Sequence, residues 1–151
     1  MRQLLFLPLL CYVGAARAQS AAPALFNTYT YTAYTVHDTI SGEPPTQVCG
    51  VSGSLTLRPT GSYKKRLSIV GPQGPVHYKQ NGTFRVSGDS ILFTVSNNKP
   101  TDVRRGTFRF DPATRRLNIV TRGLPNGTRG VYELVAAKPA SLPETLDSQR
   151  R

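Results

Sequence analysis

The sequence predicts an all-β protein, a single antiparallel up-and-down β-barrel of about eight strands. Helical periodicity is nearly absent, and short runs of alternating apolar and polar residues are separated by clusters of Gly, Pro, Asn and Asp. A four-residue motif recurs at 61–64, 82–85 and 106–109: a glycine, a small hydroxyl residue, an aromatic residue and a cation. A meander of such short units protects its edges by closing on itself, which favours the barrel.

The first predicted strand is residues 27–38. Tyr29, Tyr31 and Ala33 alternate there with threonines, so we expect these three side chains to share one face. Threonine and tyrosine also suit the pleated, half-buried surface of a sheet.

Two further strands follow a loop at 39–47. Residues 50–58 and 62–70 both alternate, and a turn at 59–61 joins them. The segment 71–75 then interrupts the pattern with two prolines, which cannot donate a hydrogen bond to a sheet.

The second half of the chain is organised as hairpins. A turn at 87–89 joins GTFRV to SILFTV, and DPAT at 111–114 joins RRGTFRF to RLNIVTR. The Asn-Gly dipeptide at 81–82 is interpreted as a turn, because Asn-Gly is a strong turn signal. After a loop at 123–130, the strand VYELVAA at 131–137 completes the domain.

The N-terminus has the order of a secretory signal. Arg2 precedes an apolar run over Leu4–Leu10, and an Ala-x-Ala motif ends at Ala18. The apolar run is too short to span a membrane as a helix. We therefore expect a signal peptide at 1–18 and a secreted or periplasmic protein.

Lipoprotein anchoring through Cys11 is the alternative. It is less favoured because Leu10 stands where a lipidation site normally has a small residue. Loss of the signal removes Arg2 and Arg17, so 19 basic residues become 17 against 8 acidic ones, a net charge of 17 − 8 = +9. Cys49 is then the only thiol, and is expected to be buried, bridged to a partner or reactive.

The remaining chain is divided into a barrel domain at 19–137 and a disordered tail at 138–151. The tail has two prolines, little apolar content and no periodicity. No second apolar run approaches membrane-spanning length, so no transmembrane segment is expected in the mature protein.

Most cations of the strands alternate out of phase with the apolar residues. They are expected to coat the outer face of the barrel, as a solvated surface or as a site for acidic envelope polymers and lipid headgroups. These cations are Arg58, Lys64, Arg66, Arg85, Arg105, Arg109, Arg116 and Arg122.

Lys65 and Arg104 break this rule. Lys65 is in phase with Tyr63 and Leu67, and Arg104 is in phase with Phe108. In strands without bulges both cations would point inward, where a carboxylate, water or an anionic ligand must compensate them. A bulge or a frayed end would turn either one outward.

Signals for catalysis, metal binding and nucleic-acid binding are weak. His37 and His77 lie far apart, and no HExxH, CxxC, G-x-S-x-G or P-loop pattern is present. The run RRGTFRF at 104–110 only partly matches an RNA-binding sheet motif, and the helices of such a domain are missing. We expect a protein that is not an enzyme and that uses no cofactor, metal or nucleic acid.

The hairpins GTFRVSGDSILFTV and GTFRFDPATRRLNIV and the closing VYELV resemble small secreted bacterial lipocalin-like domains. The resemblance covers residues 25–137. It implies an eight-stranded barrel whose open end takes a small hydrophobic ligand. Lipocalins carry a G-x-W motif near the first strand, but this chain has no tryptophan, so no binding residue is transferred from that motif.

Two functions are therefore predicted. The first is an exported, non-enzymatic lipocalin-like barrel that holds a small hydrophobic or amphipathic, anionic ligand. The second is a structural or adhesive envelope module that uses its basic outer face. Inward aromatics can form either a core or a pocket wall. The candidate ligand-binding residues are Tyr29, Tyr31, Tyr63, Lys65, Phe84, Phe93, Arg104, Phe108 and Phe110.

Overall fold

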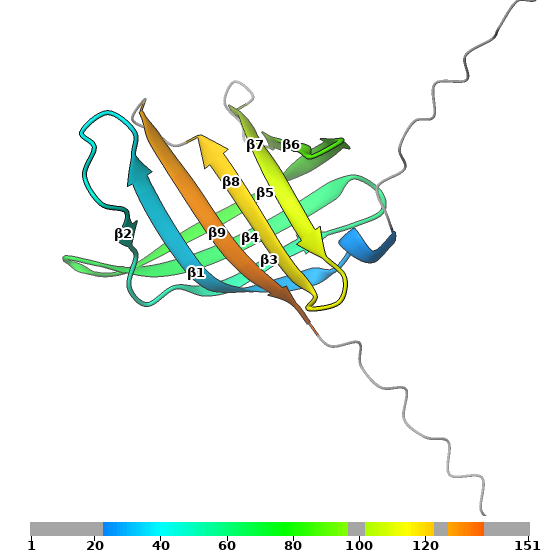
Figure 1. Cartoon of the computed structure of the whole chain (residues 1–151). Coiled ribbons are helices and arrows are strands. Elements are labelled where there is room, and N and C mark those ends of the chain that lie inside the picture. The colour runs from blue at the N-terminus through cyan, green and yellow to red at the C-terminus, as the bar shows by residue number, and fades with distance from the viewer. Residues whose placement is uncertain (1–22, 97–101, 123–126, 138–151) are drawn as a thin grey trace, which may run out of the picture.

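The computed structural model describes residues 23–96, 102–122 and 127–137 (Figure 1). All strands belong to one antiparallel sheet in the order β2-β1-β3-β4-β5-β6-β7-β8-β9, and β1 also pairs with β9. The strands are β1 (Thr28–Asp38), β2 (Thr46–Gln47), β3 (Ser52–Leu57), β4 (Ser62–Gly71), β5 (Gly74–Ser87), β6 (Ser90–Val95), β7 (Asp102–Asp111), β8 (Arg116–Arg122) and β9 (Thr128–Ala136).

The pairing of β1 with β9 closes the sheet into a barrel. The two-residue strand β2 pairs only with the far half of β1, so the barrel itself has eight strands. The predicted all-β, up-and-down barrel of about eight strands is therefore confirmed. Within the described residues, no helix is long and apolar enough to cross a membrane.

One end of the barrel is closed by its own side chains. A short 3-10 helix, η1 (Pro23–Leu25), lies there, and the hydroxyl of Tyr29 donates a hydrogen bond of 2.7 Å to the carbonyl oxygen of Leu25. Burial raises the pKa of Tyr29 to about 12, so this hydroxyl remains a donor. Leu57, Ile91 and Leu117 are also fully buried. We call this the closed end.

The opposite end is where β1, β4, β6 and β8 finish and β5, β7 and β9 begin. We call it the open end. The β4–β5 hairpin extends from the barrel at this end (Figure 1, left). Residues of the interior there are only partly buried, in contrast to the core below them.

A bulge in β1 changes which side chains face inward. Tyr31 pairs with Leu134, but Ala33 pairs with the next residue of β9, so Thr32 is the extra residue. Tyr29 and Tyr31 face the core, whereas beyond the bulge Tyr34 faces inward in place of Ala33. The prediction that Ala33 shares the face of Tyr29 and Tyr31 is therefore wrong.

The strand β5 is longer than the sequence indicates. Its pairing with β4 is unbroken, from Gly71 opposite Gly74 at the tip to Ser62 opposite Thr83. Only the two residues 72–73 form the turn, so the predicted interruption at 71–75 shortens to a hairpin tip. The Asn-Gly pair at 81–82 lies inside β5, and its interpretation as a turn is wrong. The ladder with β4 outweighs the local preference of this dipeptide.

The aromatic residue of the recurring four-residue motif (61–64, 82–85 and 106–109) faces the barrel interior in each copy, as expected. Tyr63 and Phe84 are buried, and Phe108 packs against the core. Its glycines do not all begin strands, however, since Gly82 and Gly106 lie within β5 and β7. A Cβ atom at either position would overlap a carbonyl oxygen of the neighbouring strand, so both glycines permit a close approach of backbones.

Cys49 is exposed in the segment between β2 and β3. The expectation of a buried thiol is therefore wrong: the Cys49 carbonyl oxygen accepts a hydrogen bond from the Val70 amide, but the side chain faces solvent. The predicted signal peptide, the anchoring site at Cys11 and the tail at 138–151 lie outside the described residues.

Candidate functional site

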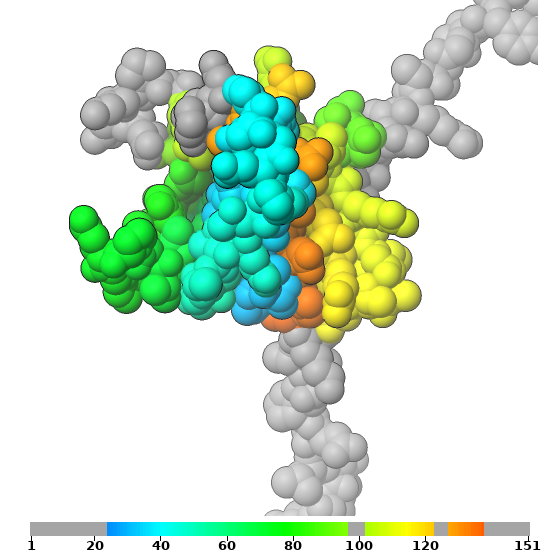
Figure 2. All heavy atoms as spheres, turned by 60° about the vertical axis from the view of Figure 1, so that its left-hand side comes forward, coloured from blue at the N-terminus to red at the C-terminus, as the bar shows by residue number. Residues whose placement is uncertain are grey.

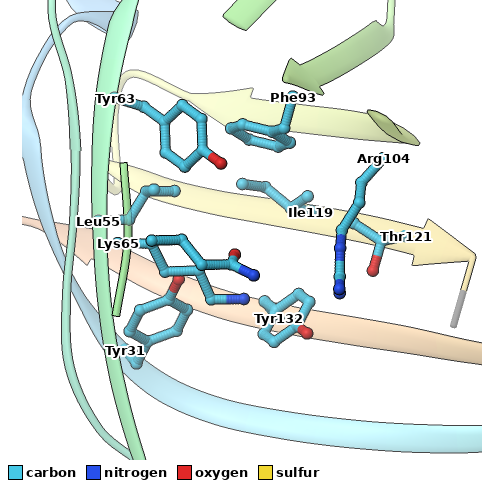
Figure 3. Close-up of a pocket in the computed structure, with 10 residues that line it drawn as sticks. Tyr31, Leu55, Tyr63, Lys65, Phe93, Arg104, Ile119, Thr121 and Tyr132 are labelled. Carbon is cyan, nitrogen blue, oxygen red and sulfur yellow. The ribbon is translucent and has the colours of Figure 1, made fainter. Parts of the chain in front are cut away.

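The open end holds a cavity of about 480 Å³. Its upper walls carry apolar and aromatic side chains: Tyr34, Val36, Val48, Leu67, Ile69 and Tyr78. Beneath it lies a small chamber of about 40 Å³, drawn in Figure 3, that reaches the packed core. Five residues line both spaces and so mark the boundary between them: Lys65, Gln80, Arg104, Thr121 and Tyr132.

Lys65 reaches this boundary from β4. The pairing of β4 with both neighbours is regular around it, so the alternation that buries Tyr63 and Leu67 also turns Lys65 inward. Its ammonium lies 4.6 Å from the centroid of the Tyr132 ring (Figure 3). Burial, and secondarily the charge of Arg104, lowers the pKa of Lys65 from 10.5 to about 8.

Arg104 reaches the same boundary from β7. It pairs with Phe93 of β6 and shares the inward face with Phe108. Its Nε and Nη2 atoms each donate a hydrogen bond of 3.2 Å to one carboxylate oxygen of Asp102. The two side chains are 40% and 48% exposed, so this ion pair contributes little to folding stability.

Both cations that break the outward rule thus face the cavity, and neither is turned away by a bulge. In the part of the chain that the structure describes, Asp102 with Arg104 is the only ion pair within 4.0 Å. Lys65 therefore has no carboxylate within 4.0 Å among these residues, and the cavity floor carries an excess of positive charge. In the low dielectric of a barrel interior, such an excess attracts an anion more strongly than it would in water.

Hydroxyl groups surround the two cations. Burial raises the pKa values of Tyr31, Tyr63 and Tyr132, so all three remain neutral hydrogen-bond donors at physiological pH. Tyr132 stacks on Tyr34 with ring centroids 4.4 Å apart and planes 5° from parallel. The stacking fixes the ring on which the Lys65 ammonium rests.

The hydroxyl of Tyr63 is buried and has no hydrogen-bond partner among the described residues. Its ring packs edge-on against Phe93, with centroids 4.9 Å apart. Figure 3 shows the hydroxyl directed toward the interior of the small chamber. A buried hydroxyl without a partner costs free energy, so this position favours a ligand or water that can pair with it.

The structure separates the predicted site residues into two groups. Tyr31, Tyr63, Lys65, Phe93 and Arg104 come together around the small chamber. The remaining four pack at the closed end: Tyr29, Phe84, Phe108 and Phe110. For these four, of the two roles that the sequence leaves open to inward aromatics, the structure shows core.

Sequence reasoning missed Gln80, Thr121, Tyr132 and Tyr34. Thr121 and Tyr132 follow the alternation of their strands and could have been found from it. Gln80 was hidden by the turn assigned to residues 81–82, and Tyr34 by the bulge in β1.

Neither histidine lines the cavity. Within residues 23–96, 102–122 and 127–137, no three His, Cys, Asp or Glu side chains gather in a group that could hold a metal ion. No family model matches the chain, and no curated protein sequence matches it.

Proposed function

We propose that this protein is an exported, non-enzymatic, lipocalin-like barrel that binds a small amphipathic carboxylate. The observation that carries the proposal is the convergence of Lys65 and Arg104 on one cavity floor, where only Arg104 has a carboxylate within 4.0 Å among the described residues. A ligand carboxylate would neutralise the remaining charge. No cofactor or metal enters the proposal.

The volumes of the small chamber and of the larger cavity support one orientation of this ligand. The chamber below the cations, at about 40 Å³, has room for roughly one water-sized group. The cavity above them, at about 480 Å³, has the usual size of a small-molecule pocket. The anionic head therefore binds innermost, and the apolar tail extends toward the open end.

The walls match that orientation. At the floor, Gln80, Thr121 and Tyr132 offer hydrogen bonds beside the two cations. Above them the tail would contact Val36, Leu67 and the other apolar residues of the upper wall. The proposed head site thus lies at the base of the cavity.

The non-enzymatic part of the proposal rests on the composition of the cavity wall. Catalysis by acyl transfer or hydrolysis needs a nucleophile with an adjacent base. The histidines and Cys49 are not among the residues that line the cavity. The lysine, the arginine and the neutral tyrosines suit the recognition of an anion.

Calorimetry with decanoate and decanol tests the proposal, because the two molecules share a tail and differ in charge. We expect decanoate to bind at least about tenfold more tightly than decanol, since the ionic hydrogen bonds exist only for the carboxylate. Lys65→Met should remove most of this difference. Lys64→Met, at the exposed neighbouring position, should leave it unchanged.

Equal affinities for decanoate and decanol would overturn the proposed role of the cations. The same conclusion would follow if Lys64→Met and Lys65→Met weakened decanoate binding equally.

A further inference from the structure

The exposed large apolar side chains of the described residues all lie at the open end. They are Ile40, Val70, Val76, Tyr78 and Val103, with exposed fractions of 77%, 51%, 39%, 45% and 46%. Ile40 follows β1, Val103 is the second residue of β7, and the other three belong to the β4–β5 hairpin. Single exposed apolar residues are common on any protein, but their confinement to one end marks a contact surface.

Ile40 is held in its exposed position. The amide and hydroxyl of Thr39 both donate hydrogen bonds to the carbonyl oxygen of Gly127, at 2.7 and 2.6 Å. Ile40 lies against Gly127 just beyond them. In Figure 2 the residues after β1 (cyan) stand forward of the barrel surface, beside β9 (orange).

We call the five exposed apolar residues the apolar rim. A row of basic residues crosses the outer face of the barrel beside Ile40 and Val103 of this rim. His37 of β1 pairs with Arg129 of β9, which pairs with Arg122 of β8. Arg105 precedes Gly106, the partner of Thr121, so the antiparallel register places it opposite Arg122. We call these four residues the basic row.

The three arginines of the basic row surround a depression of about 390 Å³. It is also lined by Thr107 and Val120, which pair with each other nearer the closed end. Like charges on directly opposite strand positions destabilise a sheet, and none of these arginines has a carboxylate within 4.0 Å among the described residues. An anion in the depression would remove that repulsion.

The carboxylates at this end are already engaged or stand apart from the row. Asp102 binds Arg104, and Asp38 accepts hydrogen bonds from the backbone amides of Ile40 and Ser41. Glu43 lies further along the same loop, where its backbone amide donates a hydrogen bond of 3.3 Å to the hydroxyl oxygen of Ser41. The row is therefore a local excess of positive charge.

The apolar rim and the basic row are arranged in a definite order. Val103 lies two residues nearer the open end than Arg105, roughly 7 Å along the strand. Ile40 likewise lies beyond His37 at the end of β1. A lipid bilayer presents the matching order, since its phosphates lie outside its hydrocarbon. A soluble polyanion would contact the basic row, but it offers no apolar surface against which the apolar rim could be buried.

We infer that the open end docks on an anionic phospholipid membrane, with the basic row on lipid phosphates and the apolar rim in the interface. The basic row lies on the outer face of the barrel, away from the Lys65 and Arg104 floor of the cavity, although Tyr78 and Arg122 also line the cavity mouth. Of the acidic partners that the basic composition suggests, it selects the lipid headgroup. It also turns the mouth of the cavity toward the membrane.

Vesicle cosedimentation tests this inference with the full mature chain. We expect binding to vesicles of phosphatidylcholine mixed with phosphatidylglycerol, weak binding to phosphatidylcholine alone, and a decrease as salt is raised. Arg122→Glu should reduce binding by about tenfold or more, since it reverses a charge at the surface. Ile40→Ser with Val103→Ser should also reduce it.

Arg116→Glu is the matched control. It makes the same charge change on the outer face of the same strand, roughly 20 Å from Arg122 and at the closed end. It should bind vesicles nearly as well as the unmodified protein. Lys65→Met should also leave vesicle binding unchanged, which separates this surface from the cavity.

Three results would overturn the inference. Equal losses for Arg116→Glu and Arg122→Glu would show that only net charge matters. Equally tight binding to dextran sulfate, with no effect of the Ile40 and Val103 substitutions, would indicate a soluble polyanion. Dimerisation that these two substitutions abolish, without vesicle binding, would indicate a second copy of the chain.

Discussion

The ammonium of Lys65 lies 4.6 Å above the ring of Tyr132, inside the barrel and beside Arg104. The ring face attracts the cation, but it replaces only part of the hydration that the ammonium loses on burial. The pKa of Lys65 therefore falls to about 8. A buried lysine with incomplete compensation lowers the stability of the folded protein and favours the binding of an anion beside it.

The first prediction concerns the pH dependence of decanoate binding. The carboxylate binds the protonated lysine, and its charge raises the pKa of Lys65 in the complex above the value of about 8 in the free protein. Affinity should therefore be constant below pH 8 and fall by up to about tenfold per pH unit above it, as far as the raised pKa. Calorimetry from pH 6.5 to about 10 measures this slope.

Lys65→Met is the control for that slope. The variant should bind decanoate weakly and with an affinity that does not change over this range. The buried tyrosines do not interfere, because burial holds the pKa values of Tyr31, Tyr63 and Tyr132 above the ordinary value of 10. A slope that persists in Lys65→Met would assign the titration to another group.

The second prediction concerns the stability of the protein without ligand. The folded-state pKa of Lys65 is lower than the unfolded value, so the unfolded state binds more protons between about pH 8 and pH 10.5. The contribution of Lys65 to the free energy of unfolding is unfavourable below pH 8 and is relieved as pH rises through this window. Lys65→Met should raise the free energy of unfolding at pH 7 by about 1–3 kcal/mol.

Urea denaturation of Lys65→Met and Lys64→Met at pH 7 measures this effect. The exposed Lys64 should change stability by less than about 0.5 kcal/mol. A destabilised Lys65→Met would contradict the prediction, since it would mean that Lys65 is well compensated in the folded state.

The third prediction contrasts two buried tyrosines. Tyr29→Phe removes a hydroxyl that donates to the Leu25 carbonyl oxygen, so it should lower the free energy of unfolding by about 1 kcal/mol. Tyr63→Phe removes a hydroxyl without a partner among the described residues, so it should leave stability unchanged or raise it by about 1 kcal/mol. Thermal denaturation of both variants measures the contrast. Equal losses of stability would show that Tyr63 has an effective partner in solution.

Alternation of residue types was sufficient to predict the fold. Successive side chains of a strand point to opposite faces, so every second residue shares a face independently of the rest of the chain. This rule places Leu55 with Leu57, and Ile91 with Phe93 and Val95, on the buried face. The same rule placed Lys65 and Arg104 in phase with buried neighbours. The bulge at Thr32 and the length of β5 could not be predicted, because both depend on the register with another strand.

The sequence by itself determined the strands, their inward faces and the two cations that interrupt the outward pattern. Only the tertiary structure decided that Lys65, Arg104 and Tyr132, from three different strands, share one cavity floor. It also decided that the core residues Tyr63 and Phe93 line the chamber, whereas Phe84 and Phe108 do not. The physical reason is closure of the barrel: strand tilt and register set the height of each inward side chain, and neither can be obtained from the alternation of a single strand.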